Sequence, residues 1–229
     1  MKKIIIYSTN DEIISLRLVD YILSNFDKNK YQFDIILSKP NFIRKIKILI
    51  VLLLLRSIFT VIKNANNKIS ISQILSKHPH SKLIKTIEKN YDFGLSVNCV
   101  DKIKIEKFKI YNFHLGCLKK QRGSFIFFYK FLFNWNYINL TFHEISNKYD
   151  VGNIISYKKI LLKENCKATD IFFSYINNLD FLVEAINKIE SPLNMFYKDY
   201  EKLNKVPNFY NLVKGLFIIY RIKIFNMFK

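Results

Sequence analysis

The chain has 229 residues, half of them apolar, which suffices for one globular domain with a sizeable core and an extension. Its 37 Lys and Arg residues outnumber 18 Asp and Glu residues, giving a formal net charge of +19. Such an excess is typical of proteins that meet phosphate, nucleic acid or anionic membranes. Because Gly and Pro are scarce while Lys, Ile, Asn and Phe abound, compositional bias accounts for part of this charge.

The three cysteines, Cys99, Cys117 and Cys166, are odd in number and widely separated. This spacing suggests neither a disulfide framework nor a zinc site. The N-terminus has two lysines and then only three isoleucines, which is too short an apolar region for a signal peptide. The sequence therefore predicts a cytoplasmic protein without a bound metal.

The N-terminal part has the pattern of a strand, a helix and a second strand. A continuous apolar run predicts a buried strand at 4–7, helical spacing predicts a helix over 12–23, and a second strand is expected at 33–37. Strands joined by a helix pair in parallel. We therefore predict an α/β, Rossmann-like fold with a mostly parallel twisted sheet, helices on both faces and a short C-terminal helical tail.

Eight successive apolar residues, 48–55, lie between Lys47 and Arg56. A membrane-spanning helix needs about 20 apolar residues, so this run does not predict an ordinary transmembrane segment. We favour a helix buried against the sheet. A helix lying on an anionic membrane remains the alternative for the whole basic and apolar stretch 42–63.

The rest of the chain continues the α/β pattern. We predict a short helix at 82–88, and strands at 93–97, 110–114, 140–145 and 154–160. Two further helices are expected, one over 124–133 with Ser124 as N-cap and one over 169–189 with Thr169 as N-cap.

The α/β unit is expected to close at Ser191-Pro192. We therefore divide the chain into a domain over 1–190 and a basic amphipathic extension over 191–229. Apolar residues at helical spacing over 209–220 predict a helix in the extension. We favour packing of this helix on the core, and membrane contact by 209–229 is the alternative.

Four short polar blocks stand among the apolar strands. They are Asn112-Phe113-His114, Arg122-Gly123-Ser124, Thr141-Phe142-His143 and Asp150-Val151-Gly152-Asn153-Ile154. Side chains two residues apart on a strand leave the same face, so Asn112 and His114 are expected to share one. An amide, an imidazole and a carboxylate are the groups that hold an oxyanion and move a proton during acyl transfer.

The order and spacing of these blocks resemble the formyltransferases that use N10-formyltetrahydrofolate. That family has an N-x-H at a strand end, a loop with a basic residue and Gly, a T-x-H strand and a D-x-G-x-I loop. The resemblance covers residues 1–189, and the layout is most similar to the short N-formyltransferases that act on nucleotide-linked amino sugars.

The resemblance implies an enzyme that moves a formyl group from N10-formyltetrahydrofolate to a primary amine without a metal. It implies that Asn112 and His114 hold the oxyanion and that Asp150 is the general base. Supporting roles are implied for His143, Thr141, Gly152, Arg122 and Gly123, with Arg122 either binding an anionic group or closing its loop. The folate is expected to contact Val97, Asn98, Leu115, Gly116 and Val151.

Several departures bear on the substrate. The loop after His114 lacks the two prolines usual in the family, which removes a stiffening element. The turn at 7–11 has no glycine for a phosphate cradle, which argues against phosphoribosylglycinamide formyltransferase. Methionyl-tRNA formyltransferases append a β-barrel of about a hundred residues, a domain in its own right, where this chain has a shorter tail.

The first hypothesis is therefore a nucleotide-linked 4-amino sugar, formylated for a surface polysaccharide. Phosphoribosylglycinamide formyltransferase and a truncated methionyl-tRNA formyltransferase-like enzyme remain alternatives. A non-catalytic relative that binds folate or membrane is the alternative of another class. We expect a small-molecule amine acceptor and no nucleic-acid partner, while a homodimer and a peripheral contact with the inner face of the membrane stay open.

Overall fold

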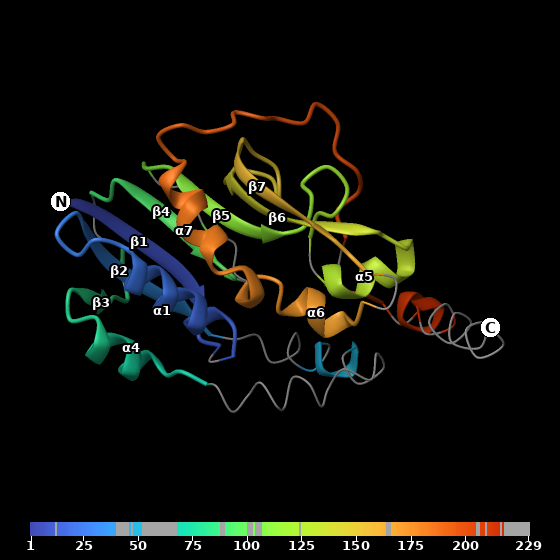
Figure 1. Ribbon diagram of the computed structural model, residues 1–229, viewed down its shortest axis with the longest axis horizontal. Coiled ribbons are helices and arrows are strands. Elements are labelled where there is room, and N and C mark those ends of the chain that lie inside the picture. Colours follow the sequence, from blue (N-terminus) through green and yellow to red (C-terminus); the bar gives the residue numbers. More distant parts are fainter. Residues whose placement is uncertain are drawn as a thin grey trace.

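The structure is a computed structural model that describes residues 1–11, 13–39, 46, 48–51, 68–87, 90–99, 103, 107–123, 125–163, 166–204, 207–208, 210–215 and 217. One seven-stranded sheet runs through it in the order β3-β2-β1-β4-β5-β6-β7 (Figure 1). The strands are β1 (Lys2–Thr9), β2 (Tyr31–Ser38), β3 (Ser81–Leu83), β4 (Phe93–Val97), β5 (Ile110–Leu115), β6 (Tyr137–Glu144) and β7 (Ile154–Leu161). Strands β1 to β5 are parallel to one another, and β6 and β7 pair antiparallel. The predicted α/β class with a mostly parallel sheet is confirmed.

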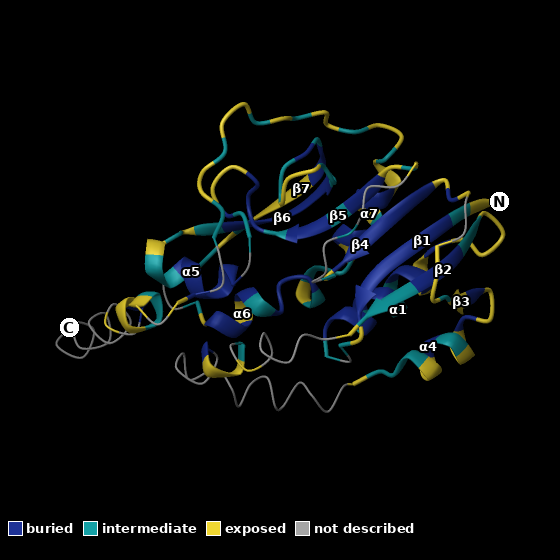
Figure 2. Cartoon of the chain, turned by 180° about the vertical axis from the view of Figure 1, so that it is seen from behind, coloured by how far each residue is buried: buried dark blue, intermediate teal, exposed yellow. Residues whose placement is uncertain are grey.

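The described helices pack on one face of this sheet and at one end of it. They are α1 (Ser15–Asn25), α4 (Ile71–Lys77), α5 (Ile126–Phe133), α6 (Ala168–Phe172), the 3-10 helix η2 (Ile176–Asn178) and α7 (Asp180–Asn187). The main core lies between one face of the sheet and α1 and α7, where Ile6, Leu16 and Leu182 are fully buried (Figure 2). A second apolar cluster lies around α5 and α6 and includes Phe127 and Ile171.

The region before β4 differs from the prediction of a helix at 82–88. Residues 81–83 instead form β3, which pairs in parallel with β2 at Phe33 to Ile35. The helix of this region comes earlier, as α4, and Ser70 begins it with a capping box to Gln73. His78 is buried after α4, with its Nε2 2.9 Å from Asp20 Oδ1.

The single long helix predicted over 169–189 is broken into α6, η2 and α7. Phe173, Ser174 and Tyr175 are successive buried residues. Successive helical residues are about 100° apart, so a straight helix cannot direct all three inward, and the chain turns. The two predicted N-caps also differ, because Lys167 precedes α6 while Phe125, with φ +61° and no capping side chain, precedes α5.

The two apolar, basic stretches are described only in part. Residues 46, 48–51, 210–215 and 217 are helical, as predicted. The remaining predicted helical residues of 52–55 and 218–220 lie outside the described residues. Burial does not follow the expectation of full packing, because Leu49, Val213 and Phe217 are exposed. The boundary at 190 stays a prediction, although the Ile154 and Arg122 carbonyls accept hydrogen bonds from residues 195 and 204 of the extension.

Candidate active site

The pairing of β5 with β6 brings four of the predicted side chains to one face of the sheet. Asn112 lies opposite His143, and His114 lies opposite Thr141. The intervening residues point to the other face, where the Phe113 and Phe142 rings stack with centroids 4.4 Å apart in the main core. This aromatic packing fixes the register, because a slip by one residue would bury the polar set and expose the phenylalanines.

His143 is a neutral histidine that orients Asn112. Its Nδ1 donates to the Glu144 carbonyl at 3.0 Å, and its Nε2 lies 3.2 Å from Asn112 Nδ2. Burial lowers the pKa of His143 to about 4, opposed by attraction to Asp150 and aided by repulsion from His114. The neutral ring therefore accepts one amide hydrogen of Asn112 through Nε2, which leaves the second amide hydrogen for another acceptor.

His114 lies next to Asp150. His114 Nε2 donates to the backbone carbonyl of Gln121 at 2.7 Å, and His114 Nδ1 lies 3.3 Å from Asp150 Oδ1. A proton on Nδ1 at this distance would lie between the imidazole and the carboxylate. Both ring nitrogens thus have partners, and in this arrangement Asn112 rather than His114 offers the hydrogen for an oxyanion.

Asp150 is held by the loop around Arg122. The Gly123 N–H donates to Asp150 Oδ2 at 2.6 Å, and Asp150 has φ +49°, an uncommon conformation for a non-glycine residue. The Arg122 guanidinium donates to the carbonyls of Tyr149, Asp150 and Glu201 at 2.8 to 3.1 Å. These contacts support loop closure as the role of Arg122 rather than the binding of an anion.

Two predicted glycines allow the backbone to approach the site closely. A Cβ on Gly116 would lie 2.2 Å from the Gln121 carbonyl oxygen and 2.8 Å from His114 Nε2, and Gly116 has φ +144°. A Cβ on Gly152 would lie 1.8 Å from the Glu144 carbonyl oxygen. Both carbonyls accept an imidazole hydrogen bond, so each glycine permits the bond that fixes one histidine.

The predicted folate contacts lie around this edge with different exposure. Val97 is wholly buried in the main core, so only its backbone could meet a ligand. Asn98 is exposed, and its Nδ2 donates to Ser15 Oγ at 2.8 Å. Leu115 and Val151 are half-buried, and Gly116 is buried. Thr141 is buried and donates to the Gly116 carbonyl at 2.7 Å, so it supports the loop after β5.

Sequence reasoning missed two residues that support the site. Gln121 supplies the carbonyl that His114 contacts, while its buried side chain accepts from the Cys117 N–H and donates to the Tyr137 carbonyl. Tyr200 places its ring 5.1 Å from the Arg122 guanidinium carbon. A backbone acceptor leaves no mark in a sequence, and Tyr200 lies 78 residues from Arg122, so neither had a local signal.

No model of a known protein family and no curated protein matches the sequence. The chain is similar to the N-formyltransferase from Helicobacter canadensis, solved with folinic acid and dTDP-3-aminofucose, with a TM-score of 0.62 and 21% identity over 94% of this chain and 81% of that one. It is also similar to WlaRD, a sugar 3N-formyltransferase solved with dTDP and 5-N-formyl-THF (TM-score 0.61, 19% identity, 94% and 79% covered).

A 4-N formyltransferase from Francisella tularensis gives a TM-score of 0.59 and 16% identity, over 94% of this chain and 86% of that one. At such identities the likeness concerns the fold. It confirms the fold that the resemblance to the formyltransferases implied. The chain therefore has the fold of the sugar N-formyltransferases.

Proposed function

We propose that this chain transfers a formyl group from N10-formyltetrahydrofolate to the primary amine of a nucleotide-linked amino sugar. The observation behind the proposal is the His114–Asp150 pair beside a pre-oriented Asn112 amide. The pair can take up and return one proton, and the amide can hold an oxygen. Formyl transfer from one nitrogen to another requires both of these functions.

Asp150 is the proton carrier in this mechanism. With a proton on His114 Nδ1, Asp150 is a carboxylate beside an imidazolium, and it takes a proton from the acceptor nitrogen as that nitrogen bonds to the formyl carbon. It then returns the proton to the departing folate nitrogen as the old carbon–nitrogen bond breaks. The Gly123 N–H and the Arg122 contacts hold the carboxylate in place throughout.

Asn112 binds the oxygen on which charge develops. When the new bond forms, an electron pair of the formyl C=O moves onto its oxygen, and the second amide hydrogen of Asn112 donates to it. His143 fixes the direction of that amide before the substrate arrives. A preorganised donor of this kind is worth about 3 kcal/mol of barrier, while the imidazolium of His114 adds positive charge near the oxygen.

The residues at the site fit the formyl donor. N10-formyltetrahydrofolate supplies the activated formyl carbon when bound. The half-buried Leu115 and Val151 flank the polar set with apolar surface, and the exposed Asn98 carries polar atoms at the end of β4. A largely apolar wall with a few placed polar groups is the usual lining of a small-molecule site. We propose these residues as the folate contacts.

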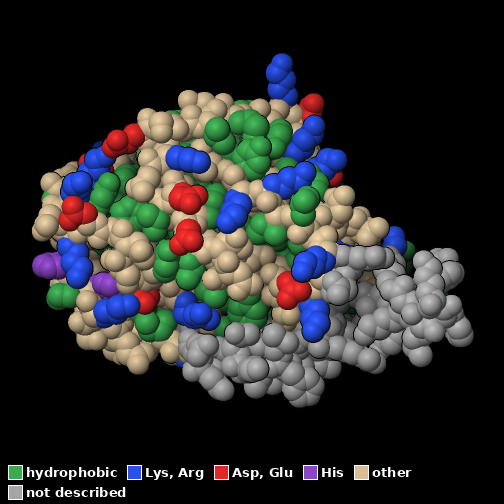
Figure 3. Space-filling model, in the orientation of Figure 1, with side chains coloured by type: hydrophobic (Ala, Val, Ile, Leu, Met, Phe, Trp, Pro, Cys, Tyr) green, Lys and Arg blue, Asp and Glu red, His purple; other side chains and the backbone are tan. Residues whose placement is uncertain are grey.

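The first turn supports an acceptor other than phosphoribosylglycinamide. Asp11 Oδ1 accepts from the Ile13 N–H at 3.0 Å, just before α1. A carboxylate therefore already lies where a phosphate would meet the helix N-terminus. For tRNA, a contiguous basic surface would be expected, whereas on the face shown in Figure 3 the Lys and Arg side chains are spread among other residues.

The solved sugar N-formyltransferases support a nucleotide-linked amino sugar. Those reported above include 3-N and 4-N enzymes, one of them in complex with dTDP-3-aminofucose. The proposal therefore covers both amine positions on the sugar.

The test is a formylation assay with the purified chain and N10-formyltetrahydrofolate. The acceptors are dTDP-linked 3-amino and 4-amino sugars, phosphoribosylglycinamide and charged initiator tRNA, and mass spectrometry of each acceptor measures the added formyl group. We expect formylation of an amino sugar nucleotide. Formylation of phosphoribosylglycinamide or tRNA alone would refute the acceptor class, and folate binding without any formylated acceptor would favour the non-catalytic alternative.

A further inference from the structure

Two short helical segments at one end of the molecule expose their apolar sides. Residues 46–51 and 210–217 both lie by α5 and α6 in two opposite views (Figures 1 and 2). Val51 is buried in the cluster around α5 and α6, and Ile48 and Leu212 pack against it. Both segments are thus fixed to the same part of the core.

The helix at 210–217 has a packed side and a free side. Leu212 contacts the cluster, Asn211 hydrogen-bonds the Tyr129 side chain, and a Cβ on Gly215 would lie 2.7 Å from the Phe128 ring. The opposite side, at spacing i, i+3, i+4 and i+7, is exposed and consists of Tyr210, Val213, Lys214 and Phe217. An ordinary surface helix would carry polar residues there.

The segment 46–51 also has apolar residues on its exposed side. Its residues Ile46, Leu49 and Ile50 are exposed at spacing i, i+3 and i+4, while Val51 is buried. We call the six exposed apolar residues of the two segments the apolar end face: Ile46, Leu49, Ile50, Tyr210, Val213 and Phe217. Exposed apolar side chains are common singly, but a group of six on two segments that pack on the same cluster indicates an interaction surface.

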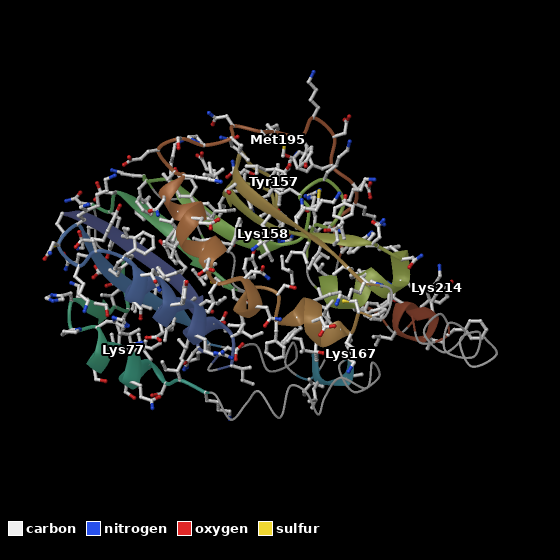
Figure 4. The ribbon with its side chains drawn as sticks, in the orientation of Figure 1. Lys77, Tyr157, Lys158, Lys167, Met195 and Lys214 are labelled. Atoms are coloured by element: carbon white, nitrogen blue, oxygen red, sulfur yellow. The ribbon has the colours of Figure 1, made fainter. Side chains whose placement is uncertain are left out.

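The two stretches of sequence that contain the apolar end face carry charge of one sign, although the exposed Asp170 lies in the nearby α6. In sequence, 42–63 and 205–229 together hold ten of the chain's 37 Lys and Arg residues and none of its 18 Asp and Glu residues. Of the described cations, Lys214 lies on the exposed side of its helix, and Lys167 begins α6. Figure 4 shows both at this end of the molecule.

We propose that the apolar end face docks this protein on the surface of an anionic lipid bilayer. Apolar side chains would enter the boundary between headgroups and acyl chains, and the surrounding lysines would meet lipid phosphates. Among the described residues no helix is long and apolar enough to cross a bilayer. The inference concerns location and goes beyond the proposed chemistry.

The chemistry of the face favours a bilayer over two other partners. A second copy docking through the same face would bring together two copies of sequence stretches, 42–63 and 205–229, that contain cations and no carboxylate, and like charges repel. Nucleic acid would use the cations but would leave the aliphatic side chains Ile46, Leu49 and Val213 in water. An anionic bilayer satisfies both the apolar and the cationic groups.

The test is co-sedimentation of the intact chain with vesicles at about 0.15 M salt, where free surface charges are screened beyond about 8 Å. One set contains phosphatidylcholine with phosphatidylglycerol, and the other contains phosphatidylcholine alone. We expect at least about tenfold stronger binding to the anionic vesicles. The Leu49→Ser/Phe217→Ser variant should lose at least about tenfold of that binding, and Lys214→Gln should lose about fivefold.

The matched control is Leu193→Ser, because Leu193 is 55% exposed, Leu49 is 51% exposed, and Leu193 lies in a different segment. It should bind like the unaltered chain, and thermal unfolding should show all variants folded. Equal binding to both vesicle types, no binding, or unchanged binding by the double variant would overturn the proposal. So would a dimer in sedimentation velocity that the double variant abolishes, since a second copy would then cover the face.

Discussion

The active-site edge, which consists of β5, β6 and the loops beside them, differs from the apolar end face in how far its side chains have partners within the chain. At the active-site edge, His114, His143 and Arg122 contact five backbone carbonyls in all, and three glycines permit close approach. At the apolar end face, large apolar side chains are exposed above a packed layer. In the first region the polar side chains that position the site already have hydrogen-bond partners within the chain. In the second region, apolar side chains are left in contact with water unless an apolar partner covers them.

This difference teaches how the two regions respond to change. In the hydrogen-bonded network of the active-site edge, a substitution also affects the neighbouring residues, because it leaves their polar atoms without a partner. An exposed apolar face transmits little to the fold, because its side chains contact mostly water. We therefore expect large effects on turnover and stability from the first region and almost none from the second.

The largest effect is expected for Asp150→Asn. An amide cannot take up the proton that the acceptor nitrogen loses, so turnover should fall by at least about a hundredfold, the scale for a positioned acid–base group. Formylation kinetics measure the loss, and thermal unfolding tests whether the variant is folded. Asp199→Asn, which changes an exposed carboxylate in the nearby extension, should leave turnover unchanged. Normal turnover in a folded Asp150→Asn variant would remove Asp150 from the mechanism.

The sequence predicted the placement of Asn112 and His114 better than their contacts. Residue types and the two-residue spacing sufficed to place Asn112 and His114 on one face, since strand geometry is local. The contact of His114 Nε2 with the Gln121 carbonyl was not predictable, because a backbone acceptor has no signal in the sequence. The sequence-based expectation that His114 itself donates to the oxyanion is replaced, in our proposal, by donation from Asn112.

The fold shows the same division between local and distant information. Strands β1, β2 and β4 to β7 were predicted within a few residues, because buried strands have continuous or alternating apolar residues. The strand β3 was mistaken for a helix, since its pairing with β2 involves residues 48 positions apart. The helix α4 has a capping box that was available in the sequence at Ser70 and Gln73 and was overlooked.

The next effect in size concerns acid stability and His143. Its pKa is about 4 in the folded chain and 6.5 as the ordinary value, so the unfolded chain binds a proton between these limits that the folded chain does not. Stability is therefore full above pH 6.5 and falls with acid, by about 2 kcal/mol from this group between pH 7 and pH 5. Denaturant unfolding at both pH values measures the change.

The control for that experiment is His143→Gln, which has no titrating group at this position. It should be less stable at pH 7, because it disturbs the Asn112 contact, but its stability should fall less steeply with acid. The two slopes differ by the contribution of His143. Equal slopes would mean that acid acts elsewhere, for instance at His114 and Asp150 or through the net positive charge.

A smaller effect is expected for Gly116→Ala. The added Cβ would meet the Gln121 carbonyl and His114 Nε2, so the hydrogen bond between these two groups must lengthen or break. His114 would then lose its fixed direction, and turnover should fall by about tenfold, the order expected when a catalytic group is misplaced. Lys119→Ala, an exposed change in the same loop, should have turnover within twofold of the unaltered chain, about the assay's scatter. An active, stable Gly116→Ala variant would show that this bond is dispensable.

The smallest effect is expected for a substitution on the exposed side of the helix at 210–217, compared with one on its packed side. Phe217 is 73% exposed, so Phe217→Ser should change the free energy of unfolding by no more than about 0.5 kcal/mol. Leu212 is packed against the cluster around α5 and α6. Leu212→Ser should therefore lower the free energy of unfolding by more than about 1 kcal/mol, because the variant loses apolar contact and places a hydroxyl there. Denaturant unfolding of both variants without vesicles gives the comparison.

Equal losses of stability in the two variants would mean that Phe217 packs on the protein, and the exposed apolar side that we assign to a bilayer would not exist. If the predicted inequality holds, any loss of vesicle binding by Phe217→Ser reports on the lipid contact and not on the fold.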